Sequence, residues 1–242
     1  MRLDAFLAER SLVDSRTDAK NFILSGAVSV NGRVISKPSF DVNGDEEISV
    51  DKSGKKYVSR GGLKLEAALD GFDIDVAGVM ALDVGASSGG FTDCLLKRGA
   101  ARVVAVDSGS GQMVESLKND PRVVLMENFN ARYMSEGDIE YRPDFVVMDV
   151  SFISAKHIIP SVASVIAEGG GFVCLIKPQF EVGRSGLNKK GIVKSEALRR
   201  SAAADVVSFA SVCGFELIGL IESPIIGGDG NVEYLAYFQK RN

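Results

Sequence analysis

Seven short apolar runs separated by helical segments constrain the fold of this 242-residue chain more than any other feature. The runs lie after residue 57, are rich in Val, Ile and Leu, and read VMALDV, RVVAVD, RVVLM, DFVVMDV, GFVCLIK, FELIGLI and EYLAYFQ. Short strands of this composition that alternate with helices are typical of a parallel sheet covered on both faces. The pattern therefore predicts a doubly wound α/β domain over residues 58–242.

The first 54 residues have a different pattern, which predicts a small N-terminal α+β domain. The segment RLDAFLAE places its apolar residues on one helical face, and Ser15 is suited to cap a second helix that stops at Gly26. Asn31 and Gly32 then lie between two β-rich pairs, which is a strong hairpin signal. The polar segment 51–57 reads as the linker between a domain over 1–54 and the larger domain.

Composition excludes several classes of protein. The three cysteines, Cys94, Cys174 and Cys213, have no close spacing, so neither a disulfide scaffold nor a CxxC zinc site is expected, and no metal is predicted. The N-terminus is too charged for a signal peptide. The longest apolar stretch, 158–176, is interrupted by a proline, a glutamate and three glycines, so no membrane span is expected. We therefore expect a cytoplasmic protein.

A glycine-rich turn follows the first apolar run and is the strongest local motif. The run ends in Asp83, and Gly85, Gly89 and Gly90 precede a helix that opens at about Phe91. Glycines between a strand and a helix let a ligand approach the backbone N–H groups closely. The alternative is a tight turn with no ligand.

The second apolar run ends in Asp107, at a strand end where an acid can hold the two hydroxyls of a ribose. The spacing Asp-x-Gly-x-x-x-Gly-Gly is not the GxGxxG fingerprint of a dinucleotide site. The two acids with the glycine turn thus favour an adenosine cofactor other than NAD, and an NAD-dependent oxidoreductase is disfavoured.

Four further residues carry the chemistry. Asp149 and Lys177 end buried strands, at the sheet edge where open α/β sheets bind ligands. A lysine that closes an apolar strand is unusual, because lysine is seldom buried without a partner. Lys64 and Glu233 complete the set, although spacing alone equally fits a solvated helix lysine and an edge charge.

In this order and context, these four residues resemble the Lys-Asp-Lys-Glu tetrad of FtsJ/RrmJ-type ribose 2′-O-methyltransferases. Nearly the whole chain resembles the TlyA, or hemolysin A-type, family in the segments SRGGLKL, DVGASSGGFTDCLL, MDVSFIS, LIKPQFE and GLNKKGIV. The resemblance implies a class I (Rossmann-like) methyltransferase domain that transfers a methyl group from S-adenosylmethionine to ribosomal RNA, with a cytidine ribose as the expected target.

The glycine turn itself resembles motif I of class I methyltransferases. The resemblance implies a set of residues that bind S-adenosylmethionine, which comprises Asp83, Gly85, Ser87, Gly89, Gly90, Phe91, Asp107, Asn130 and Asp149.

The tetrad suggests how the reaction proceeds. Lys177 would take the hydroxyl proton or stabilise the developing alkoxide. Lys64 would place the hydroxyl and, as a neighbouring cation, favour a neutral Lys177. Asp149 would lie near the sulfonium and orient Lys177, while Glu233 would orient a lysine. Two carboxylates oppose deprotonation of a lysine, so a base and an electrostatic stabiliser both stay open for Lys177.

Residues 1–50 resemble the S-four-like RNA-binding module, but they carry six basic and eight acidic side chains. We therefore expect weak RNA binding by this module, with the larger domain contributing most of the affinity. The basic residues expected to contact RNA are Arg2, Arg16, Lys20, Arg33, Lys37, Lys55, Lys56, Arg60, Arg184, Lys189 and Lys190.

The expected enzyme would have ribosomal RNA and ribosomal subunits as its partners. Two other functions are alternatives to this interpretation. A non-catalytic ribosome-assembly factor with this fold would have no need of the intact tetrad. A membrane-active hemolysin is the other alternative, but the sequence contains no signal peptide, membrane span or basic amphipathic helix that would support it. The oligomeric state stays open.

Overall fold

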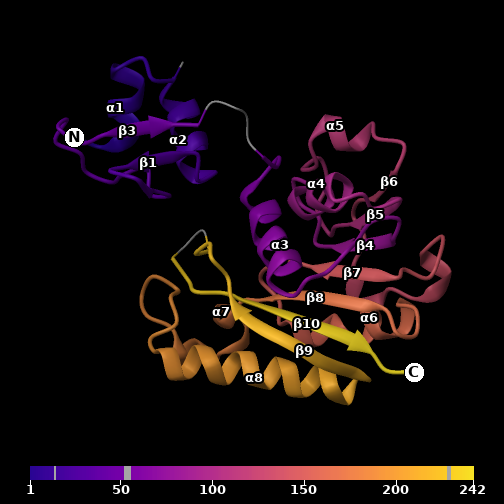
Figure 1. Cartoon of the computed structure of the whole chain (residues 1–242). Coiled ribbons are helices and arrows are strands. Elements are labelled where there is room, and N and C mark those ends of the chain that lie inside the picture. Colours follow the sequence, from indigo (N-terminus) through magenta and orange to yellow (C-terminus); the bar gives the residue numbers. More distant parts are fainter. Residues whose placement is uncertain (14, 52–55, 228–229) are drawn as a thin grey trace. The chain divides into compact units, whose positions relative to one another are not determined.

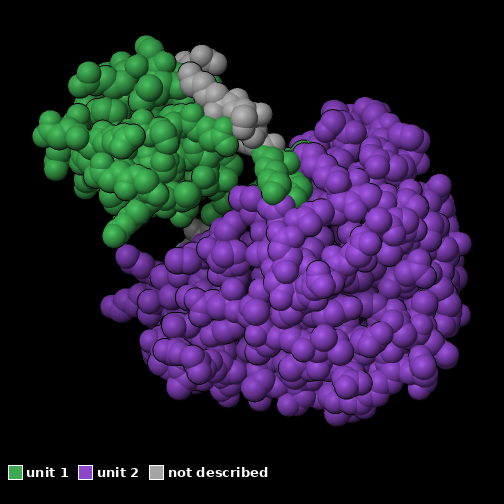
Figure 2. Space-filling view, viewed as in Figure 1, with its two compact units in different colours: residues 1–60 green, residues 61–242 purple. Residues whose placement is uncertain are grey.

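The computed structural model describes residues 1–13, 15–51, 56–227 and 230–242 (Figure 1). The chain divides into two compact units, residues 1–60 and residues 61–242 (Figure 2).

Over its described residues, unit 1 is an α+β unit of two helices and a three-stranded antiparallel sheet in the order β2-β1-β3. Its elements are α1 (Leu3–Glu9), α2 (Arg16–Leu24), β1 (Val28–Val30), β2 (Arg33–Val34) and β3 (Ile48–Val50). Ser15 caps α2, because its side chain accepts a hydrogen bond from the backbone N–H of Asp18. Leu3, Leu7 and Ile23 are fully buried between the helices and the sheet.

The predicted hairpin is confirmed at Asn31 and Gly32, whose φ angles are +50° and +75°. A two-residue hairpin turn of this kind needs positive φ at both positions, which Asn and Gly tolerate best. The side chain of Asn31 also accepts a hydrogen bond of 2.9 Å from the backbone N–H of Glu47, which ties the turn to the chain before β3.

Unit 2 is built on a seven-stranded sheet in the order β6-β5-β4-β7-β8-β10-β9. Each predicted apolar run forms one of its strands, which are β4 (Met80–Val84), β5 (Arg102–Val106), β6 (Val123–Met126), β7 (Phe145–Met148), β8 (Gly171–Ile176), β9 (Phe215–Glu222) and β10 (Tyr234–Lys240). The prediction of a doubly wound α/β sheet is confirmed.

One strand differs from the predicted parallel arrangement. β10 runs antiparallel to both of its neighbours, β8 and β9. A parallel neighbour requires a crossover of a dozen or more residues, normally with a helix. The connection 223–233 between β9 and β10 is shorter than that, so the chain returns as a hairpin.

Helices cover both faces of the sheet (Figure 1). On one face, α6 (Ile159–Val165) and α8 (Glu196–Val212) pack against alternate strand residues such as Val84, Val106 and Met148. On the other face lie α3 (Arg60–Gly71) and α4 (Gly90–Lys97). The shorter helices are α5 (Glu115–Lys118) and α7 (Pro178–Glu181), with 3-10 turns at Ala131–Tyr133, Glu136–Asp138, Ala155–His157 and Arg184–Gly186.

In the described part of the chain, no helix has both the length and the apolar character that crossing a membrane requires.

Candidate active site

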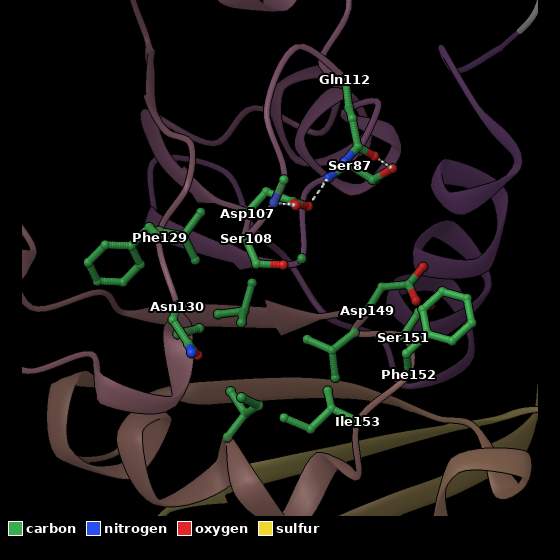
Figure 3. A pocket seen from close by; sticks show the side chains of 17 residues that line it. Ser87, Asp107, Ser108, Gln112, Phe129, Asn130, Asp149, Ser151, Phe152 and Ile153 are labelled. Atoms are coloured by element: carbon green, nitrogen blue, oxygen red, sulfur yellow. Dashed lines mark hydrogen bonds between the residues drawn. The ribbon is translucent and has the colours of Figure 1, made fainter.

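A cavity of about 580 Å³ opens at the carboxyl ends of β4, β5 and β7 in unit 2 (Figure 3). This is the edge where ligands bind in open α/β sheets, beside the point where the strand order reverses from β4 to β7. Its volume lies within the usual range for cofactor sites.

Gly85 lines the cavity, and the local geometry requires glycine there. Its φ is +86°, and a Cβ atom at this position would lie 2.6 Å from the backbone oxygen of Asp149. The turn after β4 can therefore pack against the end of β7 only without a side chain. Gly89, with φ of +93°, precedes the first residue of α4, Gly90.

Asp107 follows β5 and is held rigidly at the cavity wall. One carboxylate oxygen accepts a 2.7 Å hydrogen bond from the backbone N–H of Ser87, and the other accepts a 2.7 Å bond from that of Gly109. The Ser87 hydroxyl donates to the side-chain oxygen of Gln112 at 3.1 Å. These bonds link the turn after β4 to the turn after β5.

Asn130 lies across the cavity from Asp149, next to Phe129 (Figure 3). Its side-chain oxygen accepts a 3.1 Å hydrogen bond from the backbone N–H of Arg132, so Asn130 caps the 3-10 turn Ala131–Tyr133. The amide nitrogen is the group that Asn130 can offer to a ligand.

The structure divides the predicted cofactor residues into two sets. Those that line the cavity are Gly85, Ser87, Asp107, Asn130 and Asp149. The remainder lie behind the lining and are buried, and these are Asp83, Gly89, Gly90 and Phe91.

Asp83 differs from the sequence expectation because β4 continues one residue further, to Val84. Its side chain therefore lies within the sheet face and is completely buried. Burial, together with smaller contributions from the negative charges of Asp149 and Asp107, raises the pKa of Asp83 to about 7. The 2.6 Å hydrogen bond that Thr92 donates to it acts in the opposite direction.

Sequence reasoning missed several lining residues on the turns that follow β5, β6 and β7. They are Ser108, Gly109, Gln112, Phe129, Ala131, Val150, Ser151, Phe152, Ile153 and Ile158. Position just after an apolar run could have identified those nearest the strand ends, such as Ser108, Val150 and Ser151. Nothing in the sequence indicated the conformation of Phe152. Its φ is +64°, and the residue is 92% exposed.

The four predicted catalytic residues form two lysine–acid pairs. The Nζ atom of Lys177 lies 2.6 Å from an oxygen of Asp149, and it also donates a 2.6 Å hydrogen bond to the Ser151 hydroxyl. Lys177 comes directly after β8 and occupies the position before the first residue of α7, so the strand and the helix fix its backbone. Its side chain is only 10% exposed.

The second pair joins α3 to the start of β10. Lys64 donates a hydrogen bond of 2.5 Å to Glu233, and both side chains are nearly buried. Glu233 stands one residue before β10, whose antiparallel course brings its first residues beside the end of β8. Tyr234 thus pairs with Ile176, the residue before Lys177.

In unit 1, two of the predicted RNA-contacting residues share one buried acid. The fully buried Asp4 accepts hydrogen bonds from Arg2 at 3.0 and 2.9 Å and from Arg16 at 3.3 and 3.5 Å. These bonds, with that from Arg2 the strongest, lower the pKa of Asp4 to about 2 despite its burial. The side chains of the two arginines are about half exposed.

The other predicted RNA-contacting residues are spread over both units. The exposed ones are Lys20, Arg33, Lys37, Arg184, Lys189 and Lys190. Lys56 lies over the ring of Tyr57, with its Nζ 5.8 Å from the ring centroid. Arg60 is the first residue of α3. Lys55 lies outside the described residues.

No group of three or more His, Cys, Asp or Glu side chains within the described ranges is arranged to hold a metal ion.

Comparisons with known proteins add to this geometry. The model of the FtsJ-like methyltransferase family matches residues 57–240, and that of the S4 domain matches residues 1–48. The chain is 42% identical over 239 residues to 16S/23S rRNA (cytidine-2′-O)-methyltransferase TlyA of Mycobacterium tuberculosis, covering 98% of this chain and 89% of the relative. It is also 42% identical to Hemolysin A of Brachyspira hyodysenteriae, covering 98% and 99% of the two chains.

Solved structures agree with the fold. A candidate hemolysin from Streptococcus thermophilus superposes with a TM-score of 0.78 at 41% identity, covering 100% of this chain and 89% of the other. An S-adenosylmethionine-dependent methyltransferase from Mesorhizobium loti gives a TM-score of 0.53 at 12% identity over 72% of this chain and 96% of the other. The second likeness concerns the fold alone.

Proposed function

Because the chain belongs to the FtsJ-like methyltransferase family, we propose that it transfers a methyl group from S-adenosylmethionine to a ribose 2′-hydroxyl of ribosomal RNA, at a cytidine. The observation that carries the proposal is the placement of Lys177, which Asp149 and Ser151 hold where β7 and β8 end. Asp149 also lines the cavity, so one residue connects the cofactor site to the lysine.

The cavity fits S-adenosylmethionine by the chemistry of its lining. Asp107 offers a fixed carboxylate to the two ribose hydroxyls of a nucleoside, and Asn130 offers an amide to the base. Phe129 and Ile158 supply apolar surface for a base, and Asp149 offers negative charge to a sulfonium. The absence of a side chain at Gly85 lets the turn after β4 pack against the backbone of Asp149, so that both turns line the same cavity.

S-adenosylmethionine supplies a methyl group that is already electrophilic. In the transfer, the bond from the ribose oxygen to the methyl carbon forms while the carbon–sulfur bond breaks, and the hydroxyl proton leaves to Lys177 or to water. Lys177 can therefore act as base or stabilise the developing alkoxide. Its ion pair with Asp149 supports the second role, because that contact holds an ammonium in place.

Positioning is the main contribution expected from the protein, since well-oriented reactants can gain on the order of 7–11 kcal/mol. Lys64 is suited to place the hydroxyl because Glu233 fixes its Nζ atom. Phe152 presents an exposed ring at the cavity rim, and exposed aromatic rings stack on unpaired RNA bases.

The RNA-binding surfaces are proposed in both units. In unit 1, Arg2 and Arg16 present half-exposed guanidinium groups fixed by Asp4, which suits phosphate contacts. In unit 2, Lys189 and Lys190 are exposed in the segment that follows α7. The presence of all four tetrad residues argues against a non-catalytic assembly factor.

The test is methyl transfer from labelled S-adenosylmethionine to unmodified ribosomal subunits and to naked ribosomal RNA. We expect label at an alkali-resistant ribose position, since a 2′-O-methyl group blocks alkaline cleavage. Lys177→Ala should lower the rate by roughly 10²–10⁴-fold. Lys118→Ala, which removes a lysine of α5, is the matched control and should leave the rate unchanged. Absence of label, or full activity in Lys177→Ala, would refute the proposal.

A further inference from the structure

Glu181, the last residue of α7, is a buried acid outside the tetrad. Its side chain is 2% exposed, and both carboxyl oxygens have partners. One accepts a 2.6 Å hydrogen bond from the Ser154 hydroxyl, and the other accepts a 2.7 Å bond from the backbone N–H of Ala155. The Nζ atom of Lys156 lies 4.0 Å away. A buried carboxyl group with this many hydrogen-bonding and charged partners restrains the chain segment that carries those partners.

The partners of Glu181 all lie on the segment that follows β7, whereas Glu181 itself lies on the segment that follows the neighbouring strand β8. Segment 149–155 carries Asp149 and Ser151, and segment 177–181 carries Lys177. The hydrogen bonds of Glu181 therefore join the two chain segments that each supply one side of the lysine–acid pair.

A second contact between the same two segments is aromatic. The rings of Phe152 and Phe180 have centroids 5.4 Å apart. Phe152 has a φ of +64°, a conformation that a residue with a bulky side chain keeps only where its surroundings enforce it. The ring contact leaves Phe152 mostly exposed, so the buried bonds of Glu181 are the stronger restraint on this segment.

We propose that Glu181 is a positioning residue, which holds segment 149–155 against α7 so that Asp149 and Ser151 meet Lys177. The inference rests on the proposed methyl transfer, and Glu181 acts through these residues without contacting the reacting atoms.

The test compares Glu181→Ala and Glu181→Gln with Asp144→Ala. Asp144 is the matched control, because it also accepts a hydrogen bond from a backbone N–H, that of Met80, but lies just before β7, at the end of that strand opposite to segment 149–155. Two readouts are measured on the full chain: kcat and KM for ribosomal RNA, and amide hydrogen exchange over residues 149–156 without substrate.

For Glu181→Ala we expect kcat to fall roughly 10–100-fold with KM changed less than threefold, since small misplacements of reacting groups cost about this much. Exchange over 149–156 should become at least about tenfold faster, because the Ala155 amide loses its acceptor. Glu181→Gln keeps an acceptor and should recover most of both losses. Asp144→Ala should match the wild type over 149–156.

Equal kcat and equal exchange in Glu181→Ala and the wild type would overturn the inference. If Glu181→Ala does not fold, Ser154→Ala removes one bond of the same contact without a large cavity, and the same two readouts decide. An inactive wild-type protein would refute the methyl transfer instead, while the exchange measurement would still show whether Glu181 holds segment 149–155.

Discussion

At the scale of single residues, Gly85 is the point where the cofactor cavity and the lysine–acid pair meet. Its missing side chain lets the turn after β4 contact the backbone of Asp149. Gly85→Ala should therefore move Asp149 and strain a backbone with φ of +86°. We expect stability to fall by about 1–3 kcal/mol and the affinity for S-adenosylmethionine to fall at least tenfold. Calorimetric titration and denaturant unfolding of the variant measure both; wild-type affinity would contradict the close approach seen here.

Substitutions in the ion pair of Lys64 and Glu233 can test whether this buried pair contributes to stability or to the reaction. Removing one partner leaves an unpaired buried charge, which typically costs about 3–5 kcal/mol. Lys64→Met should thus destabilise the protein, and the double variant with Glu233→Gln should recover much of the stability. Methyl transfer should stay low in both. Recovery of activity together with stability would mean that Lys64 has only a structural role.

At the scale of elements, α1 and α2 are joined through the buried Asp4, which binds an arginine at the start of each helix. The pKa of Asp4 is about 2 in the folded chain against 3.8 ordinarily, so the unfolded chain binds more protons between these values. The contribution of Asp4 to the free energy of unfolding is therefore fully present above about pH 4 and is lost as the pH falls toward 2. Asp4→Asn should lack this dependence in denaturant unfolding across pH 2–5; an unchanged pH profile would contradict it.

Much of the element order could be predicted from the sequence. Each of the seven apolar runs became a strand, and Asn31 with Gly32 specified the hairpin of unit 1, because both signals are local. The short connection before β10 allows a hairpin with β9, but the insertion of β10 between β8 and β9 is a long-range pairing that no local pattern specifies.

The site was less accessible to sequence reasoning. Residue types and strand ends indicated the lysines and acids, and Asp149 was expected beside Lys177, but the lysine that meets Glu233 depends on the course of β10. Asp83 shows a second limit, because one extra strand residue moves its side chain from the open edge into the sheet face. The positive φ of Phe152 had no local signal, because a bulky residue rarely adopts it.

At the scale of the whole molecule, the net charge is −4, so any attraction to RNA must come from local groups. Lys189 and Lys190 are two exposed cations in unit 2. Replacing both with glutamate should weaken RNA binding and reduce the slope of log affinity against log salt by about two. Affinity for S-adenosylmethionine should not change. Filter binding across a salt series measures the slope, and an unchanged slope would exclude these lysines from the RNA contact.

The buried carboxyl of Asp83 has a consequence for the energetics of ligand capture. Its pKa is raised to about 7 by burial and by the charges of Asp149 and Asp107, which places its titration in the neutral range. Asp149 and Asp107 both line the cavity. A cation that enters it would offset their negative charge and lower the pKa of Asp83, so binding would be accompanied by the release of a fraction of a proton per molecule.

S-adenosylmethionine should then bind more tightly as the pH rises through 7, with a heat of binding that depends on the buffer's ionisation enthalpy. Asp83→Asn, or S-adenosylhomocysteine without the sulfonium charge, should show neither effect, and a buffer-independent heat for the wild type would disprove it. The catalytic domain would thus couple the uptake of its methyl donor to the acidity of its surroundings.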